Sequence, residues 1–371
     1  MKTAVVILNW NGEMFLRKFL PALLESVEGT DAEVIVADNA STDGSMKLML
    51  YEFPKVKTIR FSKNYGFTGG YNRALFQTDA EYYVLINSDI EVRKGWLEPM
   101  VEWMDTHPEC GICAPKLHSY RDRDMFEYAG AAGGYIDRFG YPFCRGRILK
   151  KVEKDYGQYD SPSPVFWASG ACMMVRSGLY RKLGGLDERF FAHQEEIDLC
   201  WRAQLAGYRI VTVPESTVWH VGGGTLPNSS PWKLYLNFRN NLLMLQNNLA
   251  KTYALDLYKD SHDPAKAAVE GILKARQTIR RRMILDGCAA VVYLVSFRFK
   301  YFSAVLKAHR DFRKAGRRPD MEDTAKFVSE NAGKVTVYGL YRKWMVPRAI
   351  AGMKIELEEY EPAPEGGRQN P

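Results

Sequence analysis

The 371-residue sequence lacks the signatures of several protein classes. With 30 Gly, 17 Pro, 46% hydrophobic and 26% charged residues, its composition is too ordinary for a collagen-like repeat, a disordered tail protein or a small disulfide-stapled domain. We therefore expect a folded protein. At roughly 100–200 residues per domain, its length predicts two domains, or one large α/β unit with an extension.

Cysteine is also scarce, and the six cysteines do not form a recognisable metal or redox framework. Cys110 and Cys113 form one CxxC pair, but no second CxxC or CxxH accompanies it, and the segment CGICAPKL is typical of a buried strand. The apolar stretch in the opening MKTAVVILNWNGE is too short and too soon interrupted for a secretory signal. We expect free thiols and a reducing cytosol.

The net charge of +7 suggests an anionic partner, and the positive charge is concentrated in one segment. Residues 271–319 carry 13 Lys and Arg but only two Asp, a net charge of +11, whereas the remainder of the chain has a net charge of −4. Apolar residues between these cations predict basic amphipathic helices, which lie on anionic membrane surfaces. The longest uncharged apolar stretch of the segment, residues 287–297, is well short of the roughly 20 residues of a transmembrane helix.

Two alternatives to the membrane interpretation remain for this basic segment. It could pack on the rest of the protein and leave a solvated basic face. It could also bind nucleic acid, but no RNP, helix-turn-helix or zinc module is present, and aliphatic residues outnumber stacking aromatics among the cations.

Short apolar runs alternate with helical patterns in the first half of the chain, which predicts βαβ units and a mainly parallel sheet. The expected strands are 4–8, 33–37, 56–61 and 82–86, and the expected helices are 15–26, one from about 45 and one from about 71. Polar residues follow each strand. The carboxyl ends of parallel strands meet at one edge of the sheet, where ligands bind in open α/β folds, so these residues predict one crevice.

Each polar cluster has a functional and an ordinary interpretation. The turn 38–44 offers acceptors and a helix N-terminus to a nucleotide, although Asp and Ser also cap helices without a ligand. The glycines of 63–72 permit close approach of a ligand to the backbone, but the segment is not GxGxxG and fits a plain loop equally well. Asn87-Ser88-Asp89 suits oxygen ligation of Mg²⁺ or Mn²⁺, or an ordinary turn.

The segment FFAHQEEIDLCWR places three carboxylates within four residues, at Glu195, Glu196 and Asp198. The carboxylates repel one another, and arginines lie nearby, so one of the carboxylates could serve as a general base with a shifted pKa. The alternative is a solvated acidic start of a helix. The surrounding Phe and Trp residues favour a cleft. His220 ends a predicted strand before three glycines, where a histidine is either structural or a metal ligand.

In their order along the chain, these motifs resemble the inverting family-2 glycosyltransferases of the GT-A fold, in particular the rhamnosyltransferase-like branch. The resemblance extends from residue 3 to about residue 245, and the matching segments are VVILNWNG, VADNASTDGS, FSKNYGFTGGYN, VLINSDIEV, FWASGACMMVRS, GGLDERFFAHQEEIDLCWRAQLAGY and WHVGGGT. It implies an α/β, Rossmann-like fold with a mainly parallel central sheet flanked by helices.

With the charge pattern, the resemblance gives three expected regions. These are a GT-A catalytic domain over 1–231, a basic amphipathic helical region over 232–320, and a C-terminal extension with a disordered tail over 321–371.

The resemblance also implies roles for individual residues. Asp38 would accept hydrogen bonds from the nucleobase. Asp89, at the DxD position of the family, would bind Mn²⁺ or Mg²⁺ on the donor diphosphate, with His220 as a second ligand. The residues expected to bind the nucleotide-sugar donor are Asn9, Asn11, Asp38, Asn39, Ser41, Asn64, Gly69, Asn72, Asn87 and Ser88.

For the chemical step, the resemblance implies that Glu196 takes the proton of the acceptor hydroxyl, with Glu195 beside it and Asp198 as the second choice of base. Trp167 and Gly170 would contact the acceptor, Trp167 as a stacking platform, although an ordinary core tryptophan is the alternative. The sequence departs from the family at two positions. Asn87 stands where the first DxD aspartate is expected, and Glu196 stands where the base is usually Asp.

The implied activity is transfer of a sugar from dTDP-rhamnose or a UDP- or GDP-activated sugar to a hydroxyl of a glycan or polyprenyl-linked acceptor, in cell-surface polysaccharide biosynthesis. The implied location is the cytoplasm, as a peripheral protein on the cytoplasmic face of the plasma membrane. A nucleotidyltransferase of similar fold, which releases pyrophosphate, is the main alternative. A nucleic-acid-binding protein that uses the basic segment is disfavoured.

Overall fold

The computed structural model describes residues 1–222 and 230–352. Residues 223–225 of the predicted glycine loop and the predicted disordered tail over 362–371 lie outside this part. Among the described residues, no helix combines the length and the apolar character needed to cross a bilayer.

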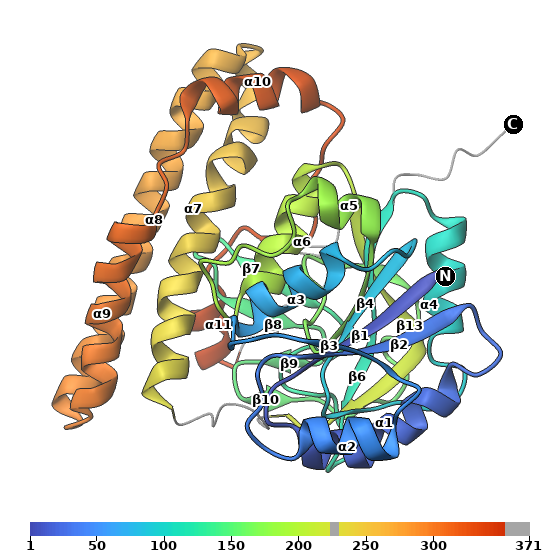
Figure 1. Ribbon diagram of the computed structural model, residues 1–371. Helices are drawn as coiled ribbons and strands as arrows, with labels where there is room; N and C mark the ends of the chain where they lie inside the picture. The colour runs from blue at the N-terminus through green and yellow to red at the C-terminus, as the bar shows by residue number, and fades with distance from the viewer. Residues whose placement is uncertain (223–229, 353–371) are drawn as a thin grey trace, which may run out of the picture.

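A central sheet of nine strands runs through the described part of the chain, in the order β11-β13-β6-β12-β4-β1-β2-β3 with β5 paired to β13 (Figure 1). Strands β3, β2, β1 and β4 are parallel neighbours, whereas β12 runs antiparallel to both β4 and β6. The strands are β1 Thr3–Asn9, β2 Ala32–Asp38, β3 Lys57–Arg60, β4 Tyr82–Ile86, β5 Ile90–Glu91, β6 Cys110–Ser119, β11 Ser163–Pro164, β12 Cys172–Arg176 and β13 Arg209–His220.

The predicted α/β class with a mainly parallel central sheet flanked by helices is confirmed, and antiparallel pairs of β5, β11 and β12 add to the parallel ones. The parallel pairs are β1 with β2 and with β4, β2 with β3, and β6 with β13. No crossover helix joins β6 to β12. The chain instead passes through short strands between them, and a parallel pair needs a crossover that these strands do not supply.

A second, smaller sheet lies beside the first and has the order β10-β9-β8-β7-β14. Its last strand comes from residues predicted to form a separate C-terminal extension, since Leu340 pairs with Ile136 in parallel register. The strands are β7 Gly134–Asp137, β8 Pro142–Cys144, β9 Arg147–Ile148, β10 Lys151–Val152 and β14 Leu340–Tyr341.

Helices cover both faces of the central sheet and bury two clusters of apolar side chains. Alternate residues of β1 point to opposite faces, so Val5 lies in one cluster and Val6 in the other. The Val5 cluster includes side chains of α1 Glu13–Ser26, α2 Ser45–Glu52 and α4 Glu98–Thr106. The Val6 cluster includes side chains of α3 Gly66–Phe76, α5 Ser177–Lys182, α6 Glu195–Leu205 and α7 Pro231–Ser261.

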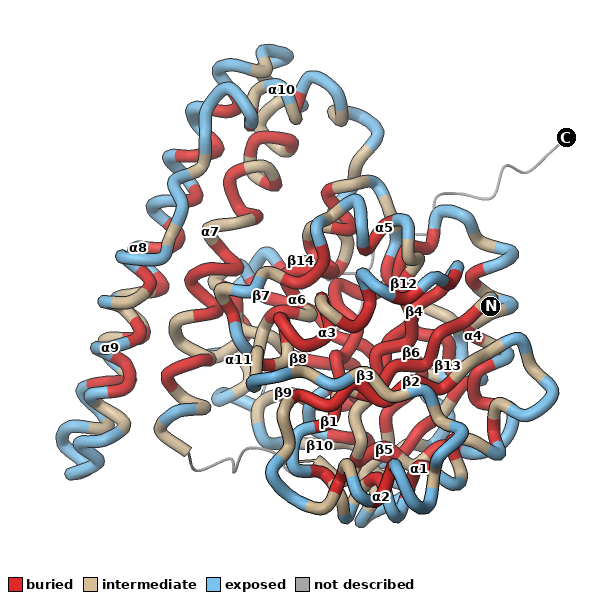
Figure 2. Tube along the Cα trace, viewed as in Figure 1, coloured by how far each residue is buried: buried red, intermediate tan, exposed pale blue. Residues whose placement is uncertain are grey.

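The second half of the chain is helical, as predicted, and it shares a core with the sheet. Leu242 and Leu245 of α7 belong to the same buried cluster as Val6. Long helices α7, α8 and α9 run side by side as an arm, buried along its inner side and exposed along its outer side (Figures 1 and 2). The remaining helices are α8 Pro264–Val295, α9 Phe299–Ala315, α10 Met321–Asn331 and α11 Met345–Ile350.

The predicted elements of the first half are found with small shifts, except that α3 begins at Gly66 instead of near residue 71. A distant carbonyl explains the earlier start. The backbone oxygen of Phe191 accepts hydrogen bonds from the backbone N–H groups of Phe67, at 2.7 Å, and Thr68, at 3.2 Å. These donors have no partner within the helix itself, so a segment more than 120 residues away completes its first turn.

All six cysteines are free thiols, and five of them are buried. Cys110 and Cys113 lie in β6, which confirms the buried strand predicted for their CxxC segment. Cys288, on α8, is exposed.

Candidate active site

Polar side chains at the carboxyl ends of β1 and β2 form one hydrogen-bonded cluster. The amide of Asn9 donates to the Asp38 carboxylate at 3.2 Å and to Ser41 Oγ at 3.1 Å, and Ser41 N–H donates to the same carboxylate at 3.1 Å. Asn11 Oδ1 accepts from the Thr42 N–H at 2.7 Å. The parallel register, in which Asn9 pairs with Asp38, brings these predicted donor-binding residues together.

A small cradle lies inside this cluster. The Oδ1 atom of Asn9 is buried without a hydrogen-bond partner, and a side chain at Gly12 would collide with it at 2.4 Å. Ser88 Oγ from the end of β4 would lie 3.2 Å from the same added Cβ. An orphan acceptor beside a space that only glycine leaves open fits a polar ligand at the sheet edge.

The amide of Asn39 extends the cluster toward α3. It donates to Asn64 Oδ1 and to the Gly66 carbonyl, both at 3.0 Å, and its oxygen accepts from the Tyr65 N–H at 2.9 Å. The predicted pair Asn39 and Asn64 therefore shapes the loop before α3.

Two predicted donor-binding residues have other surroundings. Asn72 is buried, donates to the Leu186 carbonyl at 2.8 Å, and accepts from the Leu186 N–H at 2.9 Å and the Tyr180 hydroxyl at 2.6 Å. Gly69 lies in α3, where an added Cβ would come within 2.9 Å of Arg73 Nη1. These contacts give Asn72 a structural role, and no described contact joins it to the strand-end cluster.

The predicted metal ligands Asp89 and His220 are neighbours although 131 residues separate them. Antiparallel pairing of β5 with β13 places His220 opposite Ile90, and His220 Nε2 lies 3.2 Å from Asp89 Oδ1. On the other side of the ring, Nδ1 lies 3.5 Å from Glu127 Oε1, which is long for a hydrogen bond. Burial opposes protonation of His220, but the contacts with Asp89 and Glu127 outweigh it and raise its pKa to about 10.

The donor set at this position fits a divalent cation. A carboxylate oxygen and an imidazole nitrogen suit Mn²⁺ or Mg²⁺, and a carboxylate behind the imidazole is the usual way in which a metal-ligating histidine is oriented. Among the described residues, no group of three or more His, Cys, Asp and Glu side chains is arranged to hold a metal ion, so Asp89 and His220 stand as a pair. A ligand with oxygens of its own would have to complete the coordination.

The predicted base Glu196 lies at the first turn of α6, directly beside Gly170. An added Cβ at Gly170 would lie 3.4 Å from Glu196 Cβ and 3.6 Å from Phe67 Cζ. The Oε2 atoms of both Glu195 and Glu196 are buried and have no hydrogen-bond partner. Burial raises the pKa of Glu196 to about 7, and burial with the neighbouring Glu196 charge raises the pKa of Glu195 well above its usual range.

The loop before α6 is strained and is held from two sides. Phe191, His193 and Gln194 all have left-handed backbone angles, with φ of 66°, 70° and 73°. The buried Asn240 amide of α7 donates to the carbonyls of Phe190, Ala192 and His193 at 2.7–2.9 Å. On the opposite side, α3 binds the Phe191 carbonyl as described above. Strained conformations that the surrounding structure enforces are typical of functional sites.

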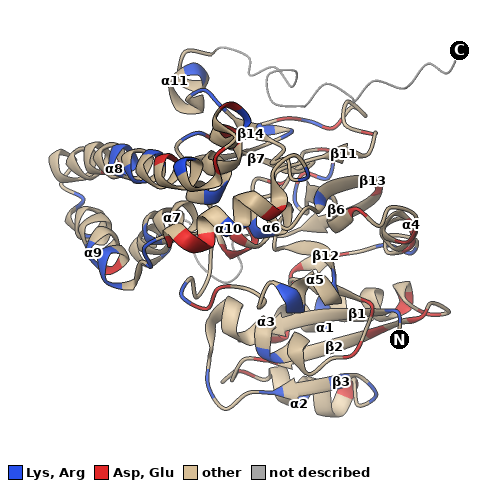
Figure 3. Cartoon of the chain, turned by 90° about the horizontal axis from the view of Figure 1, so that it is seen from above, with Lys and Arg blue, Asp and Glu red and all other residues tan. Residues whose placement is uncertain are grey.

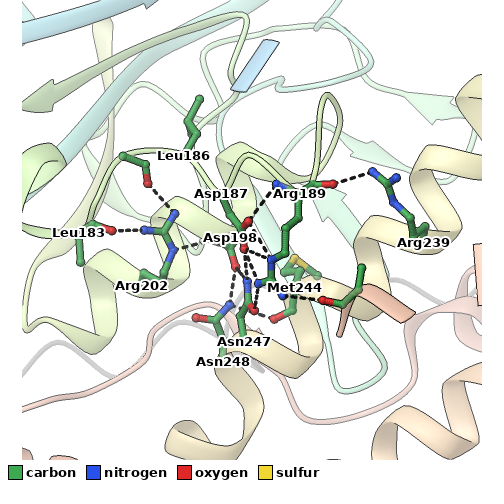
Figure 4. Close-up of polar contacts among 12 residues, drawn as sticks. Leu183, Leu186, Asp187, Arg189, Asp198, Arg202, Arg239, Met244, Asn247 and Asn248 are labelled. Atoms are coloured by element: carbon green, nitrogen blue, oxygen red, sulfur yellow. Dashed lines mark hydrogen bonds and ion pairs between the residues drawn. The ribbon is translucent and has the colours of Figure 1, made fainter. Parts of the chain in front are cut away.

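Asp198 lies on the other side of α6 and is fully satisfied (Figure 4). Its carboxylate accepts from Arg202 Nε at 2.7 Å and from the amides of Asn247 and Asn248 at 2.9 Å each. Asn247 also joins the neighbouring Asp187–Arg189 ion pair. A completely buried carboxylate with these partners is a structural group, so Asp198 is poorly placed as a base.

The structure favours the core interpretation of Trp167. Its indole is only 3% exposed, its N–H donates to the Tyr135 carbonyl at 2.9 Å, and its ring fills the space beside Gly134. No ring face is left on which a sugar could stack. Gly170, the other residue predicted to contact the acceptor, lies beside Glu196.

Three residues near the site were not singled out from the sequence. Glu127 is an isolated glutamate in an irregular loop, and Asn240 lies in a helical segment with no motif, so neither carried a signal. Lys233 follows the glycine loop, and its positive charge, second to burial, lowers the pKa of His193 to about 4. Burial also lowers the pKa of Lys233 itself.

Comparisons with known proteins find similar glycosyltransferases. The model of the family described as glycosyl transferase family 2 matches residues 4–184. Over 234 residues the chain is 28% identical to N-acetylglucosaminyl-diphospho-decaprenol L-rhamnosyltransferase of Mycobacterium tuberculosis, an alignment that covers 58% of this chain and 75% of the relative. Rhamnosyltransferase WbbL of Escherichia coli is 24% identical over 220 residues, which cover 57% of this chain and 80% of that protein.

Among solved structures, the chain resembles GalNAc-T7, crystallised with UDP, GalNAc and Mn²⁺. The TM-score is 0.54 at 17% sequence identity, over 72% of this chain and half the length of that chain. At this identity the likeness shows a shared fold.

Proposed function

Because the chain belongs to glycosyl transferase family 2, we propose that it moves a sugar from a nucleoside-diphosphate sugar to a hydroxyl group of a glycan or lipid-linked acceptor, with inversion at the anomeric carbon. Single-step inversion needs a base on the side of the sugar opposite to the leaving diphosphate. The observation that carries the proposal is the buried Oε2 atom of Glu196, which has no hydrogen-bond partner, on a carboxyl whose pKa of about 7 suits proton transfer near neutral pH.

The strand-end cluster is the proposed donor site. The Asp38 carboxylate keeps lone pairs beyond those used by Asn9 and Ser41, so it can also accept from a nucleobase N–H. Asn11, Asn39 and Asn64, with Asn87 and Ser88 at the end of β4, line the same edge and supply further polar contacts to ribose and diphosphate.

Asp89 and His220 are the proposed ligands of Mn²⁺ or Mg²⁺, and Glu127 orients the imidazole. A cation held there would supply positive charge to offset the negative charge of the departing diphosphate. Because His220 carries a proton between two carboxylates, that proton must leave when the imidazole ligates a metal.

In the chemical step, Glu196 removes the proton from the acceptor hydroxyl as its oxygen attacks the anomeric carbon. The new glycosidic bond forms while the bond from that carbon to the diphosphate oxygen breaks, and the nucleoside diphosphate leaves with the bonding pair. Gly170 leaves room for the acceptor beside the base, since any side chain there would contact Glu196.

The rhamnosyltransferases among the relatives support a deoxyhexose donor such as dTDP-rhamnose, with other UDP- and GDP-activated sugars as alternatives. The first of them acts, by its name, on a polyprenyl diphosphate-linked sugar. A membrane-lipid-linked glycan in cell-surface polysaccharide assembly is therefore the proposed acceptor.

The test is to incubate the full chain with candidate donors, Mn²⁺ and a glycan or lipid-linked acceptor, and to identify both products. We expect a nucleoside diphosphate and a glycoside of inverted anomeric configuration. Below pH 7, kcat should fall about tenfold per pH unit as Glu196 becomes protonated, and it should level off above pH 7. A thermal-shift screen with and without Mn²⁺ identifies the donor, because a ligand of the native state raises Tm.

Two results would contradict the proposal. Release of pyrophosphate would identify a nucleotidyltransferase. A glycoside of retained configuration would exclude Glu196 as the base of a single displacement.

A further inference from the structure

The turn between α8 and α9 forms an apolar tip at the end of the helical arm, away from the sheet (Figure 1). We call residues 284–306 the α8–α9 tip. Around the turn its apolar side chains are exposed, with Val295 67% and Phe297 80% exposed, and Figure 2 shows the outer side of this arm as exposed. The exposed apolar residues around the turn are Val291, Val292, Leu294, Val295, Phe297 and Phe299.

The backbone at the turn is unusual for such residues. Phe297 has a left-handed φ of 56°, a conformation that bulky side chains rarely adopt. Its ring contacts Phe299, with 6.3 Å between centroids, but neither ring is covered by the described residues. Most of the surface of this strained aromatic pair is left exposed by the described chain. A surface outside the described chain could bury it.

The charge around the tip has a single sign. Residues 280–318 contain 11 Lys and Arg and two Asp, and both Asp side chains have hydrogen-bonding partners. Asp286 is 1% exposed and binds Arg282 at 2.8 Å, and Asp311 accepts from the Tyr235 hydroxyl at 3.0 Å. The outward face therefore combines apolar side chains with exposed cations such as Arg298 and Lys300. Figure 3 shows Lys and Arg positions along α8 and α9.

We propose that the α8–α9 tip docks on an anionic membrane surface, with residues 291–299 at the boundary between headgroups and acyl chains and the surrounding cations on anionic headgroups. Exposed apolar residues flanked by Lys and Arg are the combination that binds such an interface. The proposal rests on this surface alone and does not depend on the proposed glycosyl transfer.

Docking at the tip would hold the active site beside the membrane. Ala304 and Ala308 of α9 pack with Tyr235 and Leu236 of α7, and Ala192 of the strained loop before Glu195 packs against the same cluster. At the edge of this contact, Lys307 lies over the Tyr235 ring, 4.9 Å from its centroid. The arm thus contacts the loop that positions the proposed base.

The experiment measures co-sedimentation of the full chain with phosphatidylcholine vesicles that contain or lack phosphatidylglycerol. We expect binding only with the anionic lipid, weakened strongly when salt rises from about 0.1 to 0.5 M, since screening shortens the range of the attraction. The double variant Phe297→Ser/Phe299→Ser should lose at least about tenfold in vesicle affinity. Arg298→Glu/Lys300→Glu should lose affinity mainly at low salt.

The matched control is Leu50→Ser/Tyr51→Ser on α2, which removes two comparably exposed apolar side chains from the catalytic half. It should bind vesicles like the unaltered chain. All variants should keep the same Tm shift with a nucleoside diphosphate, which separates a failure of docking from a failure of the proposed function.

Three outcomes would overturn the proposal. The first is equal vesicle binding by the tip variant and the control. The second is salt-sensitive binding to nucleic acid with none to anionic vesicles. The third is a self-association seen by analytical ultracentrifugation that the tip substitutions abolish while vesicle binding is absent, because a second copy of the chain would then be the occupant.

Discussion

Two carboxylates on α6, only two residues apart, have opposite surroundings. Asp198 faces α7 and has three hydrogen-bonding side chains, one of which is the ion-paired Arg202, whereas Glu196 faces Gly170 with a buried oxygen that has no partner. Partnered buried charges hold a structure together when complete, and an unpartnered buried carboxyl costs stability but is available to a substrate. A structural carboxylate and the proposed catalytic carboxylate therefore lie within one turn of α6, on opposite sides of the helix.

The Asp198 side and the Glu196 side of α6 are also connected through α7. Asn247 and Asn248 of α7 hold Asp198, and Asn240, two turns earlier on the same helix, holds the loop that leads into Glu195. The satisfied side of α6 thus fixes the position of the unsatisfied side. Substitutions on the two sides should have different consequences for activity and for stability.

The largest expected effect is on activity, in Glu196→Gln. Loss of the base should lower kcat by about 10²–10⁴-fold, with little change in donor affinity. The pKa of Glu196 is raised in the folded state, so the stability given by its protonated form is lost as pH rises through about 7. Glutamine cannot ionise, so at pH 8 the variant should unfold at a higher denaturant concentration than the unaltered chain.

Glu322→Gln, the same chemical change at an exposed position of α10, is the control and should alter neither quantity. Full turnover by Glu196→Gln would assign the proton transfer to another group.

Asp198→Asn should have the reverse pattern. It leaves Arg202 without its buried counter-charge, and breaking such a pair costs about 3–5 kcal/mol of the free energy of unfolding. Chemical denaturation measures this loss. Activity per folded molecule should stay within a few-fold of the unaltered chain, because the Asp198 carboxylate is already occupied by Arg202, Asn247 and Asn248. An activity loss as large as that of Glu196→Gln, in folded protein, would make Asp198 the base.

Asn240→Ala should have the smallest effect, divided between the two quantities. The carbonyls of Ala192 and His193 lose the Asn240 amide as a donor, whereas the Phe190 carbonyl still accepts from Arg239 Nη2 at 2.8 Å. Each unsatisfied buried group costs about 1–3 kcal/mol before the loop relaxes. We expect a modest loss of stability together with a fall in kcat and a shifted pH midpoint, since Glu196 moves with the loop. Asn331→Ala on α10 is the control. A change of stability with an unchanged pH profile would show that Asn240 does not position the base.

The parts of the fold that depend on local pattern were predictable from the sequence. The strand ending at Asn9 and that ending at Asp38 were recognised from apolar runs followed by polar residues, and parallel pairing then brought their ends together. His220 was found at its strand end for the same reason. The antiparallel β12 and the pairing of Leu340 with Ile136 depend on long-range contacts, which no local pattern encodes.

Site residues that belong to a sequence motif could be predicted. Residues that contact the site from a distant segment without a motif could not. Glu127 lies beside His220, and Asn240 donates to the loop before Glu195, but no motif surrounds either residue in the sequence. The early start of α3 has the same cause, because the Phe191 carbonyl replaces the missing helical acceptor. Trp167 shows the opposite case, a residue in a functional motif whose ring is used for packing.

The distribution of the cysteines has a practical consequence for spectroscopy. Five thiols are buried and Cys288 is exposed on α8, one turn from Val291 of the tip. A maleimide-linked fluorophore or nitroxide should therefore react at a single native position of the folded chain. Quenching of that label by brominated lipids would measure how deeply this helix settles into a bilayer, without any engineered cysteine.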